Sequence, residues 1–201
     1  VAYIDSVTYD AASALSASKA LEIAKTYKDS YSMEYLVLGM VSNMISTPAT
    51  ILQNQAAQFT ISNNGDREES ILCNYIQMLN QAPYTTGEEI QNSDEVVLLG
   101  TLATLDGTPQ VNGYCYSIQR PEWAAPITDF SLSTNEMQMS ASWTSEAKYY
   151  KLRLYDPSNK KMAENIITKT SLAVTLPEKG TYTFWIRPMA NNKKDYVGPA
   201  I

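Results

Sequence analysis

The sequence predicts a mainly β protein, in which a five-stranded barrel with an N-terminal helix precedes a β-sandwich. Three observations lead to this fold class. A helical hydrophobic period over residues 16–30 changes to a period of two from Tyr35 onward. Two dipeptides typical of tight hairpins, one Asn-Gly and one Asp-Gly, lie among the strand patterns that follow. After Pro121, short strands recur with turn signals and without a helix. We therefore expect two domains, residues 1–121 and residues 122–201.

The phrase SASKALEIAKTYKDS, residues 16–30, predicts the helix. Its apolar positions recur at the i, i+3, i+4, i+7 spacing of one amphipathic stripe: Ala20, Ile23, Ala24 and Tyr27. Ser16 or Ser18 is expected to cap the first turn, and Asp29-Ser30 ends the run. We expect the apolar stripe to pack on a sheet.

Five strand patterns follow the helix, with the third and fourth separated by a longer link. They occupy residues 35–45, 58–62, 67–75, 94–105 and 110–119. Residues 45–57 are expected to be a loop. Asn64-Gly65 predicts a two-residue hairpin before the third strand, and Asp106-Gly107 predicts another between the fourth and the fifth.

Three strands, a link and two strands is the chain order of the OB-fold, a partly open five-stranded Greek-key barrel. The phrases ALEIA, YLVLGMV and SDEVVLLGTL within residues 11–120 resemble OB-like domains of bacterial surface lipoproteins and exported proteins. The matching strand has Tyr35, Val37, Gly39 and Val41 at the positions of that group's pattern. The sequence departs from the group at Ser93, where the group usually has Gly. The resemblance implies a fold and carries no particular activity.

The second domain is predicted as a sandwich of seven short strands, the last at residues 196–201. The phrase SLAVTLPEKGTYTFWIRPMA, together with Trp143 on an earlier strand, resembles the fibronectin type III family or, more broadly, an immunoglobulin-like domain. That resemblance covers residues 126–201. It implies that Trp143 is the core tryptophan and that Tyr182 occupies the tyrosine-corner position, and we expect both side chains to be mostly buried.

Charge argues against a nucleic-acid-binding barrel. Residues 1–121 contain five Lys or Arg against thirteen Asp or Glu, a net charge of −8. Binding of single strands depends on a basic groove that neutralises phosphates, with aromatic side chains on which bases stack. The aromatic residues of this domain are interpreted mostly as core: Tyr75, Tyr84, Tyr114 and Tyr116. We therefore expect no nucleic-acid partner.

The composition also argues against catalysis and metal binding. The chain has no His, which removes the commonest general base and metal ligand. An enzyme would depend on the dense carboxylate pairs, but adjacent residues on a strand point to opposite faces. These pairs are Glu68-Glu69, Glu88-Glu89 and Asp94-Glu95. We predict no catalytic residue, no metal site and no cofactor, and we interpret the pairs as solvated charge.

Cys73 and Cys115 are too few for a disulfide framework and lack the CxxC spacing of zinc or redox sites. The OB strand order would bring their strands together, so a bridge is conceivable in an exported protein. Alternation, however, assigns Cys73 to the inner face and Cys115 to the outer face, so their Cβ atoms would diverge. We therefore predict free thiols.

The preferred function is a non-enzymatic binding or scaffold module that recognises a glycan or a protein partner. OB-folds bind ligands on strands two and three and on the loops after strands one and four. The amides found there suit sugar hydroxyls and are our candidate ligand-binding residues: Gln53, Asn54, Gln58, Gln110 and Asn112. A single-strand-binding OB-fold protein is the alternative, and a carboxylate-dependent hydrolase is the least favoured reading.

The resemblance to exported and surface proteins implies location at the cell surface or in the periplasm. No stretch of the sequence is apolar over the eighteen or so residues that would span a bilayer. We therefore expect no membrane span, and lipid anchoring upstream of Val1 as a possible attachment.

Overall fold

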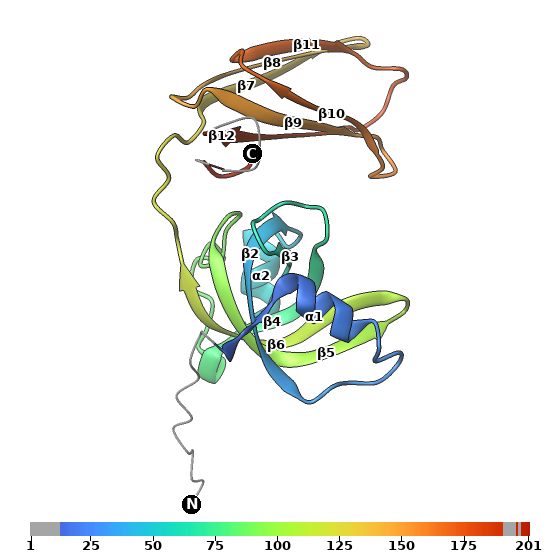
Figure 1. The fold of residues 1–201 in the computed structure, drawn as a ribbon, viewed down its shortest axis with the longest axis vertical. Coiled ribbons are helices and arrows are strands. Elements are labelled where there is room, and N and C mark those ends of the chain that lie inside the picture. Colours follow the sequence, from blue (N-terminus) through green and yellow to red (C-terminus); the bar gives the residue numbers. More distant parts are fainter. Residues whose placement is uncertain (1–12, 191–195, 197) are drawn as a thin grey trace, which may run out of the picture. The chain divides into compact units, whose positions relative to one another are not determined.

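A computed structural model describes residues 13–190, 196 and 198–201 of the chain. The chain divides into two compact units, Val1–Pro121 and Glu122–Ile201. Figure 1 shows the first unit in blue to yellow-green and the second in yellow to red. Each unit has a hydrophobic core of its own. The mainly β fold class is confirmed.

The first unit is a closed barrel whose strands pair in the order β2-β3-β4-β6-β5, with β5 pairing back onto β2. The pairing of β4 with β6 is parallel and the other pairings around the barrel are antiparallel. This strand order is the OB order that the sequence predicts. The strands are β2 (Glu34–Met44), β3 (Ala57–Ser62), β4 (Ile71–Met78), β5 (Glu95–Leu105) and β6 (Thr108–Gln119), and a short strand β1 (Leu15–Ser16) pairs with β2.

The predicted N-terminal helix is α1 (Ala17–Ala24), which contacts all five barrel strands and buries Ala17, Ala20 and Ala24 in the barrel core. Ser16 caps it, because its hydroxyl oxygen accepts a hydrogen bond from the backbone N–H of Lys19. The helix is shorter than predicted. Ala17 approaches the barrel closely because Gly39 faces it: a Cβ added at Gly39 would lie 3.2 Å from the Cβ of Ala17.

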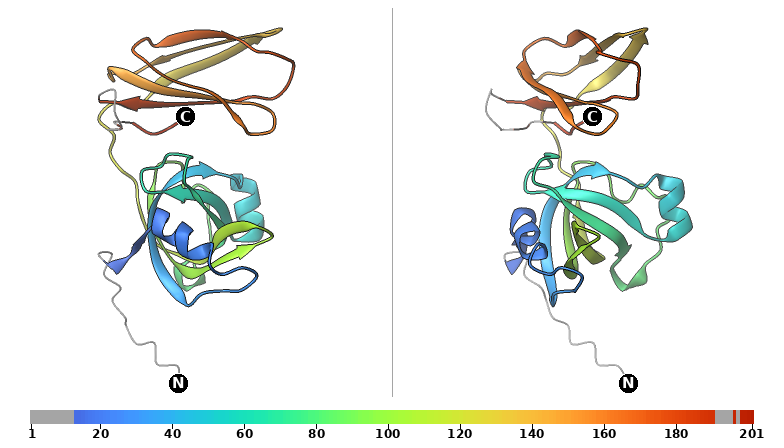
Figure 2. Two further views of the ribbon diagram at one scale, coloured as in Figure 1. Left: turned by 45° about the vertical axis from the view of Figure 1, so that its right-hand side comes forward. Right: turned by 90° about the vertical axis from the view of Figure 1, so that its right-hand side faces the viewer.

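A second helix, α2 (Pro48–Asn54), lies where we predicted a loop. Thr47 caps its start, Pro48 occupies its first turn, and Gln55 ends it in the left-handed conformation with φ 51°. Figure 2 shows α1 and α2 on opposite sides of the barrel. Ile51 of α2 is buried in the barrel core, so the segment between β2 and β3 has a packing role that its loop-like composition hides.

The two predicted hairpins have different outcomes. Asp106-Gly107 joins β5 to β6 directly, with φ 50° and 75° as a type I′ turn requires. Asn64-Gly65 does not form the predicted two-residue turn. It lies in a connection that runs from the end of β3 at Ser62 to the start of β4 at Ile71. In that connection the Asn64 side chain accepts a hydrogen bond from the backbone N–H of Asp66 instead.

Two three-stranded antiparallel sheets, β10-β9-β12 and β11-β8-β7, form the second unit. Its strands are β7 (Thr128–Asn135), β8 (Gln138–Thr144), β9 (Tyr149–Tyr155), β10 (Lys161–Ile167), β11 (Ser171–Thr175) and β12 (Thr183–Met189). Residues of both sheets share one core, so the sheets pack face to face. The predicted seventh strand is replaced, in its described residues, by a bridge from Tyr196 to Met189 and by paired backbone hydrogen bonds between Ile201 and Ile186.

The fibronectin resemblance implies that Trp143 and Tyr182 are mostly buried, and the structure confirms this for Trp143 alone. Trp143 is 5% exposed and meets the ring of Tyr150 edge-on at 5.3 Å between centroids. The Tyr182 hydroxyl donates to the backbone carbonyl of Glu178 at 3.1 Å, the upstream contact of a tyrosine corner. Tyr182 is half-buried rather than mostly buried.

The predicted free thiols are confirmed, although the reason given for them was wrong in part. Cys73 and Cys115 are both free and both lie in the barrel core. Cys115 faces inward, in regular alternation with the buried Val111. After Cys115, β6 carries an extra residue at Tyr116, because Leu98 pairs with Cys115 but Val97 pairs with Ser117. This bulge changes the alternation between Cys115 and Ser117. Along β6, Cys115 lies four positions beyond Val111, the partner of Cys73, so the register keeps the thiols apart.

We expect neither thiol to react with a thiol reagent in the native protein and both to react after unfolding without reductant. Burial raises the pKa of Cys73, with a smaller contribution from Cys115, and burial raises the pKa of Cys115 to about 12. The unfolded chain should give two reactive thiols per chain in a colorimetric titration. Fewer than two without reductant would show a bridge and contradict the register.

Candidate functional site

Four side-chain amides form a hydrogen-bonded row across three neighbouring barrel strands. We call Gln58, Asn74, Gln110 and Asn112 the amide row. The Gln58 Nε2 donates to Asn74 Oδ1 at 3.0 Å, and the Asn74 Nδ2 donates to Gln110 Oε1 at 3.4 Å. The Gln110 Nε2 then donates to Asn112 Oδ1, also at 3.4 Å. The row thus runs from β3 over β4 to β6.

Strand alternation places the amide row on the outer surface of the barrel. Phe59, Cys73 and Val111 are fully buried in the core, and the register pairs Phe59 with Cys73 and Cys73 with Val111. Neighbours of these three residues along each strand point the other way. Gln58, Asn74, Gln110 and Asn112 are such neighbours. The row therefore begins on β3 and β4, the second and third barrel strands, whose face carries ligands in OB-folds, and continues onto β6.

The row is uncharged and partly shielded from solvent. Gln110 is 4% exposed, whereas Gln58, Asn74 and Asn112 are half-buried. The Nδ2 of Asn112 is buried and makes no hydrogen bond to any described residue. An amide carries both donors and acceptors, so a chain of four amides presents both kinds of group along one line. This arrangement suits a ligand that offers several neutral polar groups.

The structure brings together three of the five predicted ligand residues and separates the other two. Gln58, Gln110 and Asn112 belong to the amide row, whereas Gln53 and Asn54 lie exposed on α2. No hydrogen bond among the described residues joins Gln53 or Asn54 to the row. Sequence reasoning missed Asn74, although it is the polar residue between buried Cys73 and the end of the predicted third strand.

The aromatic residues of the barrel divide between core and surface. Tyr84 is 3% exposed and its hydroxyl donates to the carbonyl of Ile76 at 3.0 Å. Burial raises the pKa of Tyr84. Tyr114 and Tyr116 are half-buried. Tyr75 is 59% exposed, so the core interpretation is wrong for this residue.

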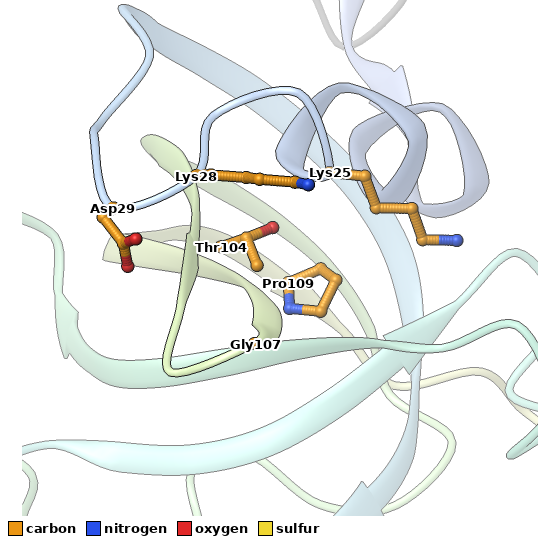
Figure 3. Close-up of a pocket in the computed structure, with 6 residues that line it drawn as sticks. All are labelled: Lys25, Lys28, Asp29, Thr104, Gly107 and Pro109. Atoms are coloured by element: carbon orange, nitrogen blue, oxygen red, sulfur yellow. The ribbon is translucent and has the colours of Figure 1, made fainter.

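A cavity of about 520 Å³ lies between the end of α1 and the β5–β6 hairpin (Figure 3). It is lined by Lys25, Lys28, Asp29, Thr104, Gly107 and Pro109. Thr104 is anchored there, because its hydroxyl donates to the carbonyl of Ala24 at 2.8 Å. The register pairs Thr104 with Pro109 and Ala103 with Gln110. Since adjacent strand residues point to opposite faces, this cavity and the amide row lie on opposite faces of the hairpin.

Two carboxylates of the acidic pairs, Asp94 and Glu89, have structural partners, and the interpretation as solvated charge is wrong for Asp94. Asp94 is buried and receives two hydrogen bonds of 2.9 Å from the guanidinium of Arg120. Glu89 accepts backbone hydrogen bonds from Thr85 and Thr86. Partial burial acts to raise the pKa of Glu89, but these hydrogen bonds outweigh it and lower the pKa to about 2. A carboxylate with that pKa is a poor proton donor near neutral pH.

Among the described residues, no three or more Cys, Asp or Glu side chains gather as a metal ion requires. No helix in the described part of the chain is long and apolar enough to cross a membrane.

Comparison with known proteins adds little. No family model and no curated protein matches the chain. Among solved structures, the chain is similar to the crystal structure of the FN1–FN3 domains of chicken CNTN1, with 14% identity over 81% of this chain and a TM-score of 0.29. The match spans 52% of that chain, about half its length. The fold described above rests on the strand pairing and the cores.

Proposed function

We propose that this chain is a non-enzymatic binding module of an exported or cell-surface protein, and that the outer face of its barrel binds a neutral glycan. The amide row is the observation that carries this proposal. It places donors and acceptors in one line across β3, β4 and β6, and β3 and β4 are the second and third barrel strands, whose face binds oligosaccharides and oligonucleotides in OB-folds.

The chemistry of the row favours sugars over nucleic acids. A sugar presents neighbouring hydroxyls that both donate and accept, which matches paired amide groups. A single strand presents phosphates, whose binding depends on cations. The outward residues of the row are amides, and the domain has a net charge of −8, from five basic and thirteen acidic residues. Lys25 and Lys28 lie at the cavity on the other face of the hairpin.

Attachment and location belong to the same proposal. The resemblance of residues 11–120 to OB-like domains of surface lipoproteins supports an exported protein, held by a lipid anchor upstream of Val1. The sandwich then serves as a spacer or as a second binding domain. A protein partner on the same barrel face is the remaining candidate within this function.

A glycan array with a labelled single-stranded DNA control tests the proposal. We expect the full chain to bind neutral glycans and to show no DNA binding at physiological salt. Asn74→Ala should weaken glycan binding about tenfold, because it removes the central member of the row and two hydrogen bonds of about 0.5–1.5 kcal/mol each. Gln53→Ala, an exposed amide on α2, is the matched control and should bind like the wild type.

Two results would count against the proposal. If Asn74→Ala bound glycans as well as the wild-type protein does, the amide row would not be part of the binding site. Micromolar binding of the labelled DNA that weakens steeply with salt would replace the glycan by a nucleic acid.

A further inference from the structure

Tyr75 has an unusual backbone conformation for a residue inside a strand. It lies within β4, yet its φ is 56°, in the left-handed region. A bulky side chain is rare there, because its Cβ lies too close to the following carbonyl oxygen. The Tyr75 side chain is 59% exposed, so little burial offsets this strain. Strained residues of this kind are concentrated at functional sites.

The strain arises from a bulge in β4, which is evident in the pairing of β4 with both neighbouring strands, β3 and β6. Between β3 and β4, Phe59 pairs with Cys73 but Ala57 pairs with Ile76, so β4 carries one extra residue. The parallel pairing with β6 also shifts between Cys73 and Gln77. The extra residue lies between Cys73 and Ile76, which are both fully buried in the core. Bulges beside functional sites re-aim side chains in this way.

The bulge places two consecutive residues on the outer surface. Asn74 holds the centre of the amide row through its hydrogen bonds to Gln58 and Gln110. Tyr75 follows it, and its exposure excludes the core as its location. In a regular strand one of these two side chains would point inward. The strained bulge therefore sets an exposed aromatic ring next to a line of uncharged hydrogen-bonding groups.

We propose that Tyr75 is the stacking platform of this face, and that the bound group is a neutral hexopyranose. The negative face of the tyrosine ring attracts the C–H groups of one face of the sugar, while the amide row binds its hydroxyls. This inference rests on the proposed function and narrows it to glycans with an apolar C–H face, such as those built from galactose or glucose.

Affinity electrophoresis of the full chain in gels that contain soluble β-galactan, β-glucan or mannan tests the platform. We expect at least one polysaccharide to retard the wild type. Tyr75→Phe keeps the ring and should be retarded like the wild type, whereas Tyr75→Ala should lose at least tenfold in affinity. Tyr31→Ala is the matched control, because Tyr31 is 58% exposed in the same barrel but lies before β2. It should behave like the wild type.

A stability measurement separates a binding role from a structural one. Tyr75→Gly removes the left-handed strain and should raise the thermal midpoint of the barrel by about 4 °C, while it abolishes retardation. Protection of the buried Cys73 and Cys115 thiols from labelling checks that each variant is folded.

The outcomes distinguish this inference from the proposed function. Retardation that is lost in Asn74→Ala but unchanged in Tyr75→Ala and Tyr75→Gly would overturn the platform and leave glycan binding in place. A Tyr75→Gly variant less stable than the wild type would show that Tyr75 stabilises the barrel, which also contradicts the proposal. A wild-type chain that no polysaccharide retards and no array glycan binds would overturn the function and the platform together.

Discussion

Gly113→Ala should destabilise the barrel by about 3 kcal/mol, at the upper end of the usual range for overpacking. Gly113 in β6 lies opposite Gly100 in β5. A Cβ added at Gly113 would clash with the carbonyl oxygen of Leu99 and lie 2.6 Å from the Cα of Gly100. Both obstacles are backbone atoms, so the methyl group fits only if the two strands separate. Because β5 also closes the barrel by pairing with β2, separation weakens the closure itself.

The two units contain different natural probes, so the stability of the barrel can be measured separately from that of the sandwich. Both cysteines of the chain, Cys73 and Cys115, lie in the first unit, and its three tryptophans lie in the second. Thiol labelling during urea unfolding therefore reports the barrel, and tryptophan fluorescence reports the sandwich. We expect Gly113→Ala to expose the thiols at lower urea and to leave the tryptophan transition unchanged.

Gly107→Ala is the matched control for this clash. A Cβ at Gly107 would meet nothing within 4 Å, but its φ of +75° disfavours alanine. We expect a loss of about 1–2 kcal/mol from the backbone conformation alone. A Gly113→Ala barrel as stable as the Gly107→Ala barrel would show that β5 and β6 separate without cost, contrary to the close approach of the two strands.

Glu164→Gln should destabilise the sandwich by about 2 kcal/mol. Glu164 in β10 accepts a 2.7 Å hydrogen bond from the Nε of Arg153 and forms ion pairs with Lys151 at 3.4 Å and Lys161 at 3.1 Å. The Arg153 side chain is fully buried and its guanidinium lies 4.7 Å from the centroid of the Trp185 ring. Breaking a buried ion pair typically costs about 3–5 kcal/mol. We reduce that figure because the Glu164 side chain is 34% exposed.

The same carboxylate predicts a dependence of stability on pH. Partial burial acts to raise the pKa of Glu164, but the hydrogen bonds from Arg153 and Lys161 and the nearby charges outweigh it and lower the pKa to about 2. A carboxyl whose pKa is lower in the folded than in the unfolded state stabilises the fold at every pH above its unfolded pKa, which is about 4.5 for Glu164. That stabilisation is lost as the pH falls from about 4.5 to about 2.

Urea unfolding followed by tryptophan fluorescence measures both effects. Stability of the wild-type sandwich should fall more steeply between pH 5 and pH 2 than that of Glu164→Gln. Glu146→Gln is the control: Glu146 is exposed in the same unit, and its replacement should change stability by less than about 0.5 kcal/mol. Parallel pH profiles for wild type and Glu164→Gln would mean that the ion pairs with Glu164 contribute little.

Features that depend on neighbouring residues could be predicted from the sequence. Ser16 caps α1 because its hydroxyl lies three residues before a free N–H, and Asp106-Gly107 forms its turn because both residues tolerate positive φ. Ser93 illustrates the same local control. It stands where the resembling domains have Gly, and its φ is 70°.

Features that depend on distant residues could not be predicted. The alternation pattern of β6 wrongly predicts that Cys115 faces outward, because no residue type near Tyr116 indicates the bulge there. The bulge at Tyr75 is equally hidden, since tyrosine is a residue that ordinarily favours regular strands. Asn64-Gly65 has the composition of a tight turn, yet the connection there is longer, with Asp66 hydrogen-bonded to Asn64.

The number of barrel strands and the lack of histidine could be read from the residues of the chain, and the OB strand order and the buried Trp143 from its resemblance to known folds. The number of strands follows from periodicity and turn residues, which act over a few neighbouring positions, whereas the strand order and the role of Trp143 are what the resemblances imply. Which amides meet, in contrast, depends on the pairing of distant strands. Gln58, Asn74 and Gln110 come from three strands, and their hydrogen bonds exist because barrel closure sets the register in which β3, β4 and β6 pair. Register is a property of paired strands, so a single chain pattern does not contain it.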